Sequence, residues 1–469
     1  MESHLQVKSP KLMAAVLMVG TFIGLFGETA LNMALTNIME DFNVSAGLAQ
    51  WLTTGYLLVL GILVPLSAYL VRWFTTRQLI VSALIIAIIG AFIAATSPNF
   101  TLLLVGRLIQ AIGTGIVLPL MFSVVLMVFP IQKRGAVMGI VGLVLTAGPA
   151  LGPTIAGLII SSSSWHYIFW IMLVLNVILL IIGGAKMENV SEITKPKIDV
   201  LSLLLSTIAF GGIVFALATL AETPFSDAIV WAPLVTGVLA LILFAIRQFK
   251  MEHPMINLRV FSFPMFALGT VLMFATLFVI LTVAILIPIY LKSVLGYTAI
   301  AAGLIMLPGN VLNIIMSPIV GTNFDKVGAK IFTRIGFSMI SLAAIFLVFG
   351  LSATTAVWQV VVALCVFFVG VSMTIMPAQT NAMNTLVPQL YADGSAAMNT
   401  LTQVAGAAGT AVAITLFTAG QNNYIAEHGP QNPADFLAYG VSHAFVAVLV
   451  VGIIGLIGSL FIKNSRPQH

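Results

Sequence analysis

The sequence predicts an all-α integral membrane protein with fourteen transmembrane helices. Of its 469 residues, 60% are hydrophobic and only 7% are charged, with a mean hydropathy of +1.14. A soluble domain carries about 25% charged residues, so this chain cannot present an ordinary water-facing surface. Its apolar runs reach the roughly 20 residues that a helix needs to cross a bilayer, and they recur along the chain. A transmembrane barrel would show short alternating segments instead.

Polar breaks divide the chain into fourteen apolar spans. They are expected at 13–36, 50–71, 78–96, 101–129, 135–160, 166–185, 200–221, 228–246, 265–290, 298–320, 331–351, 357–380, 394–418 and 441–462. The first stretch is too long for a cleavable signal and ends without a small-residue cleavage site, so we expect it to be retained as a helix. The polar stretch Gly420–Gly440 is interpreted as a solvated loop between the last two spans.

The basic residues predict the orientation of the spans. Cytosolic loops carry an excess of Lys and Arg. With the amino terminus in the cytosol, 17 of the 19 basic residues fall in cytosolic segments, leaving Lys292 outside and Arg107 inside a span. A miscounted helix would scramble this alternation in every later loop. We therefore expect a multi-pass protein of the bacterial inner (plasma) membrane with both termini cytoplasmic.

Several classes of function are disfavoured by the residues. The single cysteine, Cys365, allows no disulfide or cysteine-based metal site within one chain. We find no zinc-ligand cluster and no phosphate-binding glycine loop, so ATP hydrolysis is not expected. A membrane-embedded enzyme would need clustered acids, histidines or a metal site, yet the histidines are scattered. The expectation is a non-enzymatic protein with no catalytic residues, no metal site and no nucleic-acid partner.

One acidic residue lies well inside a span. Of the 14 acidic residues, only Glu28 does so, and an ionisable group at membrane depth costs about 3 kcal/mol on insertion scales. Such a group is a functional candidate, here for reversible proton binding. The alternative is a static ion pair, with Arg107 as the natural partner. The two interpretations are compatible, since a carboxyl group can alternate between a proton and a nearby arginine.

Further polar residues lie within the predicted spans of both halves. We interpret them as lining a substrate cavity between two helical bundles, although polar side chains at such depth also commonly bond to neighbouring helices. These residues are Asn32, Tyr56, Gln110, Asn310, Asn313, Gln379, Asn399 and Gln403.

The fifth span contains two Gly-Pro pairs in series. It reads GLVLTAGPALGPTIAG, with Gly148, Pro149, Gly152, Pro153 and Gly157. Gly148 and Gly152 are about one turn apart, which lets a neighbouring helix approach closely. The prolines remove backbone donors and should bend or loosen the helix. A plain packing seam is the alternative interpretation.

This segment resembles the antiporter motif of the major facilitator superfamily, in its fourteen-helix drug:proton antiporter branch. GRLIQAIGTG, from Gly106, is similar to the helix 4 motif of that family, and SWHYIFWI and HPMINLRVFSFPMFAL resemble recurrent stretches of the branch. The resemblance implies two six-helix bundles, at 1–190 and 261–469, joined by a linker at 191–260 that carries two additional helices. It also implies a monomeric, proton-coupled antiporter without a cofactor that exports amphiphilic or cationic drugs.

The chain departs from the family pattern at two places. The branch usually has its helix 1 acid at the position of Gly27, whereas this chain has Glu28, and Arg72 stands where the helix 2–3 motif has Asp. The related motif after the tenth span is better kept, with Gly321, Asp325, Lys326 and Gly328. A gating salt bridge implied by the resemblance is therefore better supported at Asp325 than in the first half.

Two other kinds of transporter stay open from the sequence. One exports an endogenous lipid, peptide or metabolite, with drug efflux incidental. The other is a proton-independent facilitator or channel, which would leave Glu28 without a function.

Overall fold

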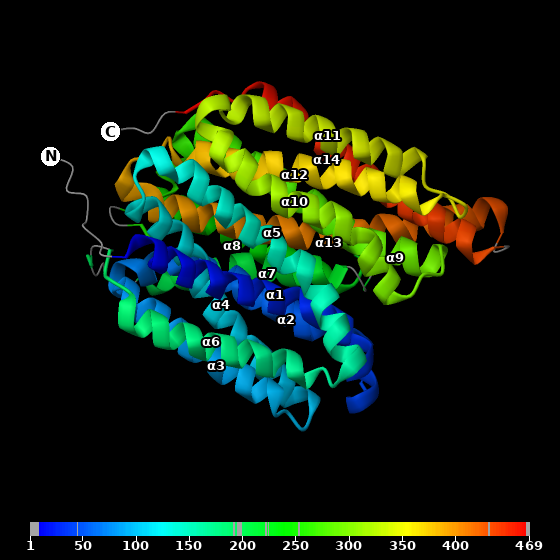
Figure 1. Ribbon diagram of the computed structural model, residues 1–469, viewed down its shortest axis with the longest axis horizontal. Helices are drawn as coiled ribbons and strands as arrows, with labels where there is room; N and C mark the ends of the chain where they lie inside the picture. Colours follow the sequence, from blue (N-terminus) through cyan, green and yellow to red (C-terminus); the bar gives the residue numbers. More distant parts are fainter. Residues whose placement is uncertain are drawn as a thin grey trace.

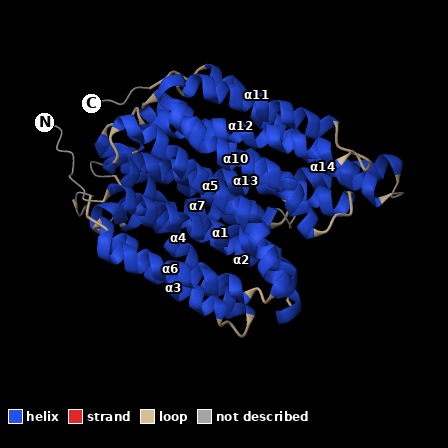
Figure 2. Cartoon of the chain, in the orientation of Figure 1, coloured by secondary structure: helices blue, strands red, loops and turns tan. Residues whose placement is uncertain are grey.

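The computed structural model describes residues 9–44, 46–190, 193–194, 199–220, 223, 225–251, 254–429 and 432–465. Within them the chain forms fourteen long α-helices and no strand (Figure 2). The helices are α1 Pro10–Phe42, α2 Ala46–Trp73, α3 Thr76–Ala95, α4 Phe100–Val128, α5 Ile131–Ser162, α6 His166–Lys186, α7 Val200–Leu220, α8 Ala228–Lys250, α9 Pro264–Ile289, α10 Ala299–Val327, α11 Ala329–Phe349, α12 Val357–Met383, α13 Tyr391–His428 and α14 Pro433–Leu460. Three short helical segments lie beside α9 and α13: the 3-10 helices η1 Leu258–Ser262 and η3 Pro388–Leu390, and the π-helix η2 Tyr290–Val294.

Polar residues in the connections start several helices. The Thr75 hydroxyl accepts a hydrogen bond from the Gln78 N–H in a capping box, and Asn99 caps α4 in the same way. Asp227 and Thr298 cap α8 and α10. Each cap satisfies a backbone donor that the first turn of a helix leaves unpaired. The helix starts are therefore encoded locally, by single polar residues between apolar runs.

The helices pack as two groups of six with a hairpin between them (Figure 1). α1 to α6 pack on one another, α9 to α14 pack on one another, and α7 pairs with α8 while touching both α2 and α13. α5 lies along α10 and joins the two groups directly. Gly90 faces Gly106 between α3 and α4, and Gly336 faces Gly370 between α11 and α12, so both pairs approach closely. The fourteen-helix architecture is confirmed.

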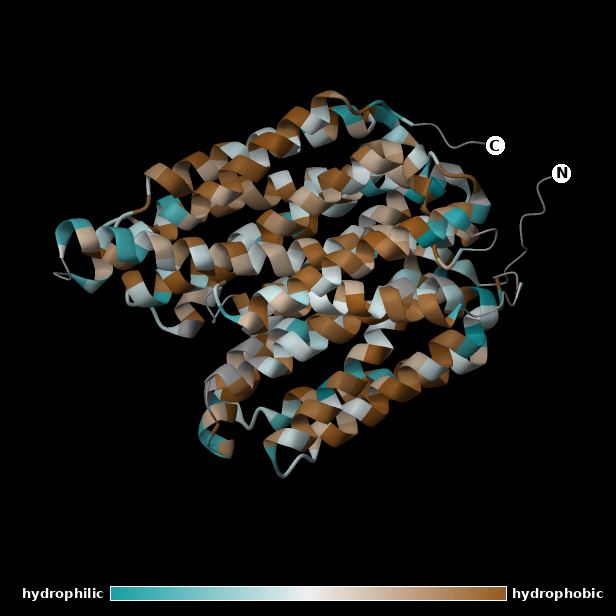
Figure 3. Cartoon of the chain, turned by 180° about the vertical axis from the view of Figure 1, so that it is seen from behind, coloured by the Kyte–Doolittle hydropathy of each residue, from teal (hydrophilic) through white to brown (hydrophobic). Residues whose placement is uncertain are grey.

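The start of α1 and the end of α14 lie at one end of the bundle, which we call the terminal end (Figure 1). At the opposite end the turn between α1 and α2 lies far from the tip of the α13–α14 hairpin. Hydrophilic residues gather toward the two ends and hydrophobic ones cover the length between them (Figure 3). Thirteen helices of the described chain are long and apolar enough to span a membrane, and α2 contains a shorter apolar stretch, Trp51–Leu63.

The expected loop at Gly420–Gly440 is wrong. α13 continues to His428 and α14 begins at Pro433, so the two helices extend as a hairpin past the predicted spans. Gly420 lies against Gly440, and the Tyr424 and Tyr439 rings are 5.4 Å apart. Small residues and ring contacts thus hold a polar helical pair together where hydropathy indicated a connector.

Candidate functional site

The turn of α1 that carries Glu28 lies against the Gly-Pro motif of α5. A Cβ added to Gly148 would lie 2.9 Å from the Leu25 Cβ, and one added to Gly152 would collide with the Thr29 hydroxyl. Gly157 faces the Met33 methyl group. α5 remains helical through Pro149 and Pro153, and the side chain of Pro153 lies outside the described residues. The motif therefore provides a groove of small residues that seats the helix bearing the acid.

Arg107 of α4 is fully buried and only partly satisfied. Its guanidinium lies 4.3 Å from the centroid of the Tyr56 ring, and its Nη1 donates to the Gln110 Oε1 at 3.0 Å. Its Nε and Nη2, and the Gln110 Nε2, have no hydrogen-bond partner among the described residues. Buried donors without a partner cost free energy, so they favour any state that brings them an acceptor.

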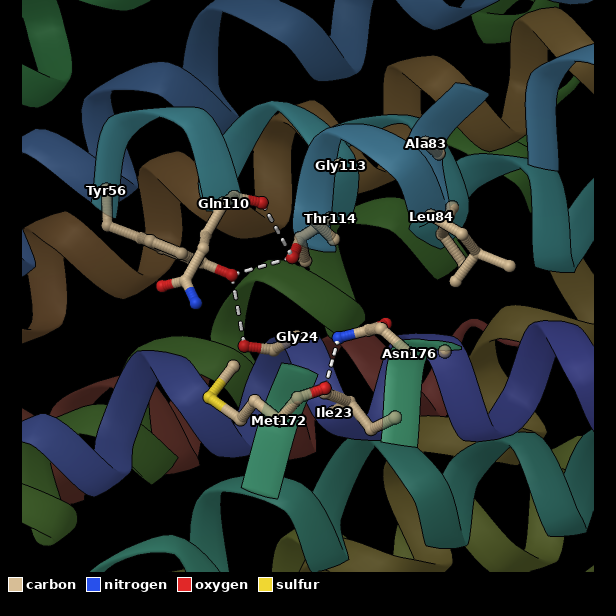
Figure 4. Close-up of a pocket in the computed structure, with 13 residues that line it drawn as sticks. Ile23, Gly24, Tyr56, Ala83, Leu84, Gln110, Gly113, Thr114, Met172 and Asn176 are labelled. Atoms are coloured by element: carbon tan, nitrogen blue, oxygen red, sulfur yellow. Dashed lines mark hydrogen bonds between the residues drawn. The ribbon is translucent and has the colours of Figure 1, made fainter. Parts of the chain in front are cut away.

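Tyr56 and Gln110 lie inside the N-terminal bundle, around a small cavity (Figure 4). The Tyr56 hydroxyl donates to the Gly24 carbonyl at 3.0 Å and lies 2.7 Å from the Thr114 hydroxyl. The cavity measures about 20 Å³, with Asn176 and Met172 of α6 on its far wall. This volume holds about one water molecule, not a drug. These two residues contact Arg107 in this structure, and their place in a substrate cavity stays a prediction.

Glu28 is half-buried on α1, within range of the positive charge of Arg107. The preceding position, Gly27, faces the same guanidinium directly. A Cβ built on Gly27 would lie 3.7 Å from the Arg107 Nη1, but it would collide with the Met172 side chain. The acid thus stands one position after a residue that faces Arg107.

The expected cavity residues of the C-terminal bundle lie on three helices. Asn310 and Asn313 are buried on α10, Gln379 is buried on α12, and Asn399 is buried on α13, where its amide donates to the Ser395 carbonyl one turn earlier. Gln403 of α13 is half-buried. The Asn313 Oδ1 has no hydrogen-bond partner among the described residues. The side chain of Asn32 lies outside the described residues, so its place in a cavity stays a prediction.

An ion pair joins the two bundles at the terminal end. The Arg72 Nη2 of α2 donates to the Asp393 Oδ2 of α13 at 2.5 Å, and Asp393 is only 1% exposed. The Asn257 N–H donates to the other carboxylate oxygen at 3.1 Å. A buried carboxylate that accepts two charge-assisted hydrogen bonds is held firmly in place. The Arg72 position, which departs from the family pattern, thus has its carboxylate partner on α13, in the second half of the chain.

Two further contacts close the same end. The Arg134 Nη1 of α5 donates to the Tyr391 hydroxyl of α13 at 3.0 Å. A Cβ added to Gly139 of α5 would lie 3.0 Å from the Gly321 Cα and from the Ser317 carbonyl oxygen of α10. The bundles are thus in backbone contact there. The terminal end of the molecule is closed in this structure.

The motif at the end of α10 is only partly described. Gly321 provides the close contact with α5, and Lys326 is exposed. Gly328 has a φ of +81°, a left-handed conformation that favours glycine, and its α-carbon packs on Asn464. The side chain of Asp325 lies outside the described residues, so a salt bridge at this position stays a prediction.

Sequence reasoning missed Asp393, Asn257 and Gln248 as a connected set. Asp393 lies one residue before the predicted start of its span, so it was grouped with loop acids. Its signal was indirect, because an arginine in place of the expected Asp at position 72 implies an acid elsewhere. A single sequence gives no means of finding a partner 321 residues away.

The chain is similar to known transporters along its whole length. A family model described as the Major Facilitator Superfamily matches residues 17–410. A lincomycin resistance protein of Bacillus subtilis is 50% identical over 99% of this chain and 98% of its own. One from Listeria monocytogenes is 48% identical, with 98% of each chain covered.

Solved structures confirm the fold. The structure of a proton:xylose symporter, XylE, has a TM-score of 0.68 at 14% identity and covers 98% of this chain and 97% of its own. The human organic anion transporter MFSD10 has a TM-score of 0.67 at 13% identity, covering 96% of this chain and 99% of its own. Both the sequence match and the helical architecture lead to one conclusion: this chain belongs to the major facilitator superfamily, whose members are multi-pass membrane transporters.

Proposed function

We propose that this transporter is a proton-coupled antiporter that exports amphiphilic or cationic antibiotics from the cytosol. The single observation that carries the coupling is Glu28, an acid within α1 whose charge interacts with the buried and incompletely bonded Arg107. The relatives named lincomycin resistance proteins, at 50% and 48% identity, support an antibiotic of the lincomycin type as substrate. Because these relatives are named resistance proteins, they support export as the direction.

The coupling follows from the donors around Arg107. When Glu28 is deprotonated, its carboxylate is the acceptor that the free Nε and Nη2 groups lack. When Glu28 is protonated, that attraction is lost and α1 is released from α4. Each proton taken up from outside thus changes how α1 is held between α4 and the α5 groove, and α5 in turn packs on α10 of the second bundle.

Alternating access supplies the rest of the cycle, as in other repeat-built transporters. The excess of basic residues there supports a cytosolic position for the terminal end. The contacts of Arg72, Arg134 and Gly139 then close the cytosolic side in this structure. Substrate loading requires that these contacts open. Proton binding at Glu28 favours release outward, and proton loss to the cytosol resets the transporter.

The test is Glu28→Gln in proteoliposomes with an imposed pH gradient and lincomycin as substrate. We expect the variant to fold and to lose gradient-driven transport, while substrate exchange without a gradient persists. Glu40→Gln, which removes an exposed acid from the same helix, is the matched control and should transport normally. Full gradient-driven transport by Glu28→Gln would refute the coupling, and a failure to move any antibiotic in a wider substrate panel would refute the drug assignment in favour of a metabolite.

A further inference from the structure

We infer that the α7–α8 hairpin sets the closure of the terminal end, with Gln248 of α8 as its positioning residue. The inference goes beyond proton coupling, because it assigns a task to the two helices that lie between the bundles. It depends on three connected sets of contacts: those that anchor the hairpin, those that Gln248 makes to the segment Pro254–Asn257, and those of that segment to the Arg72–Asp393 pair.

The hairpin is anchored by a pair of charges at the terminal end. Arg247 of α8 donates two hydrogen bonds to Asp199, at 2.7 and 2.9 Å, and the Ser202 hydroxyl of α7 donates a third. The Arg247 guanidinium holds the pKa of Asp199 at about 2, below its ordinary value of 3.8. Asp199 therefore stays ionised at any physiological pH, and the anchor is independent of the proton gradient.

Gln248 connects this anchor to the segment that follows α8. Its side chain is 2% exposed. Its Nε2 donates to the Ser202 hydroxyl at 2.7 Å, and its Oε1 accepts from the backbone N–H of Met255 at 2.6 Å and of Ile256 at 3.3 Å. A side chain with these three bonds fixes the path of the backbone at Met255 and Ile256.

The flanks of those two residues hold the ion pair. The Pro254 carbonyl accepts from the Arg72 Nη1 at 3.4 Å, and the Asn257 N–H donates to the Asp393 Oδ1 at 3.1 Å. One end of the segment thus contacts the cation and the other end contacts the anion. Asp393 is almost fully buried, and a buried charge depends strongly on each of its donors. Displacing the segment would weaken the hydrogen bond to Arg72 and the hydrogen bond to Asp393 at the same time.

The hairpin also contacts both bundles through α7. α7 packs on α2, where the Phe215 and Trp51 rings are 5.4 Å apart, and it packs on α13 as well. Opening the terminal end requires α2 and α13 to separate, which breaks the Arg72–Asp393 pair. Through Gln248 the hairpin favours the closed arrangement, and movement of α7 is the way to release it.

Spin-label distances across the terminal end test this inference. Cysteines replace the exposed Lys133 of α5 and Lys330 of α11, in a Cys365→Ser background. The distances are measured in lipid nanodiscs without substrate or gradient, so a failure of proton coupling would leave the result intact. The parent should show one short distance. Asp393→Asn should add a longer one and raise the open-to-closed ratio on the order of tenfold.

Gln248→Met keeps the side-chain length but removes the three hydrogen bonds, and it should raise the open-to-closed ratio in the same direction as Asp393→Asn. Thr236→Val is the matched control on the same helix, because the Thr236 hydroxyl bonds only within α8. It should leave the distances unchanged. An unchanged distribution in Gln248→Met, with a shift in Asp393→Asn, would overturn the role of the hairpin and leave the ion pair as the gate.

A second pair of variants tests the segment itself. Asn257 has a φ of −75°, which proline adopts without strain, so Asn257→Pro removes the N–H that reaches Asp393. Asn257→Ala keeps that N–H and loses only the side-chain cap of η1, where the Asn257 Oδ1 accepts from the Arg259 N–H. The proline variant should open the terminal end and the alanine variant should not. Equal distributions in the two variants would contradict the inference.

A double-mutant cycle separates a positioning role from simple destabilisation. If Gln248 acts through the ion pair, Gln248→Met should add little to the opening already caused by Asp393→Asn. Additive effects, accompanied by equal losses of thermal stability, would show that Gln248 only supports the fold.

Discussion

Where α5 meets α10, the two bundles touch through backbone, whereas where α2 meets α13 they touch through charged side chains. At the α5–α10 seam, Gly139 leaves no room for a Cβ against Gly321 and Ser317. At the α2–α13 seam, Arg72 and Asp393 form an ion pair, and α7 packs on both helices. The first seam is closed by shape and the second by charge. A seam closed by shape is insensitive to ions and pH, while one closed by charge can be released by moving a single donor.

The largest effect is expected from filling the shape-closed seam. Gly139→Val places three carbon atoms against the α10 backbone, and overpacking of this kind typically costs 1–3 kcal/mol. Efflux of antibiotic from cells should fall on the order of a hundredfold at equal protein level. Gly184→Val is the control, because a Cβ at Gly184 meets nothing within 4 Å. Normal efflux by Gly139→Val would show that the α5–α10 contact is not needed for the cycle.

The next effect is expected from reversing the charge at the second seam. Arg72→Glu leaves the buried Asp393 opposite a like charge, so the terminal end should open about tenfold more often. Arg72→Lys should open the terminal end more often than the parent and less often than Arg72→Glu, since an ammonium group cannot span both Asp393 and the Pro254 carbonyl. The Arg72→Glu/Asp393→Arg exchange should recover only part of the closure, because the Asn257 N–H needs an acceptor there and a helix start disfavours a cation. The rate at which a cysteine engineered at the terminal end reacts with a thiol reagent measures the opening in all three variants.

A smaller effect is expected from α7, which packs on both helices of the second seam. Phe215→Ala removes the ring that contacts Trp51 and should cost about 1 kcal/mol beyond the lost buried area. Detergent-solubilised protein should melt a few degrees lower, and closure of the terminal end should weaken about fivefold or less. Phe249→Ala, at an exposed position of α8, should change neither quantity.

The smallest effect is expected from removing the charge of Asp199, and it tests whether the hairpin takes part in the pH dependence of efflux. The pKa of Asp199 lies at about 2, below its ordinary value of 3.8, because Arg247 donates to it. Its contribution to stability is therefore complete above pH 4 or so and is lost only as pH falls toward 2. Asp199→Asn should lower the rate of efflux about twofold, as for a partly exposed pair, without moving its pH midpoint. A shifted midpoint would show that the hairpin takes part in sensing protons.

The fold was predictable because hydropathy and loop charge are properties of the chain alone. Fourteen apolar spans became fourteen helices, and the Gly-Pro motif of α5 predicted a close helix neighbour, which is α1. Hydropathy detects what faces lipid and not where a helix ends. For that reason it missed the α13–α14 hairpin, whose polar turns are held by Gly420 against Gly440.

The site was predictable residue by residue, but its connections were not. Glu28 and Arg107 could be identified because charges at membrane depth are rare. That Tyr56 would lie beneath the Arg107 guanidinium depends on the rotation of α2 about its axis. Sequence periodicity does not set this rotation when nearly every face of a helix is apolar. The Arg72–Asp393 pair depends on the packing of two helices far apart in the chain.

The contact between Gly27 and Met172 restricts how the acid of α1 could have moved between related proteins. A Cβ at position 27 would lie 3.7 Å from the Arg107 Nη1 but would collide with the methyl end of Met172, so a carboxyl group there requires the Met172 side chain to move. Positions 27, 28 and 172 should therefore change together across the lineage, and a comparison of many relatives would reveal in which order.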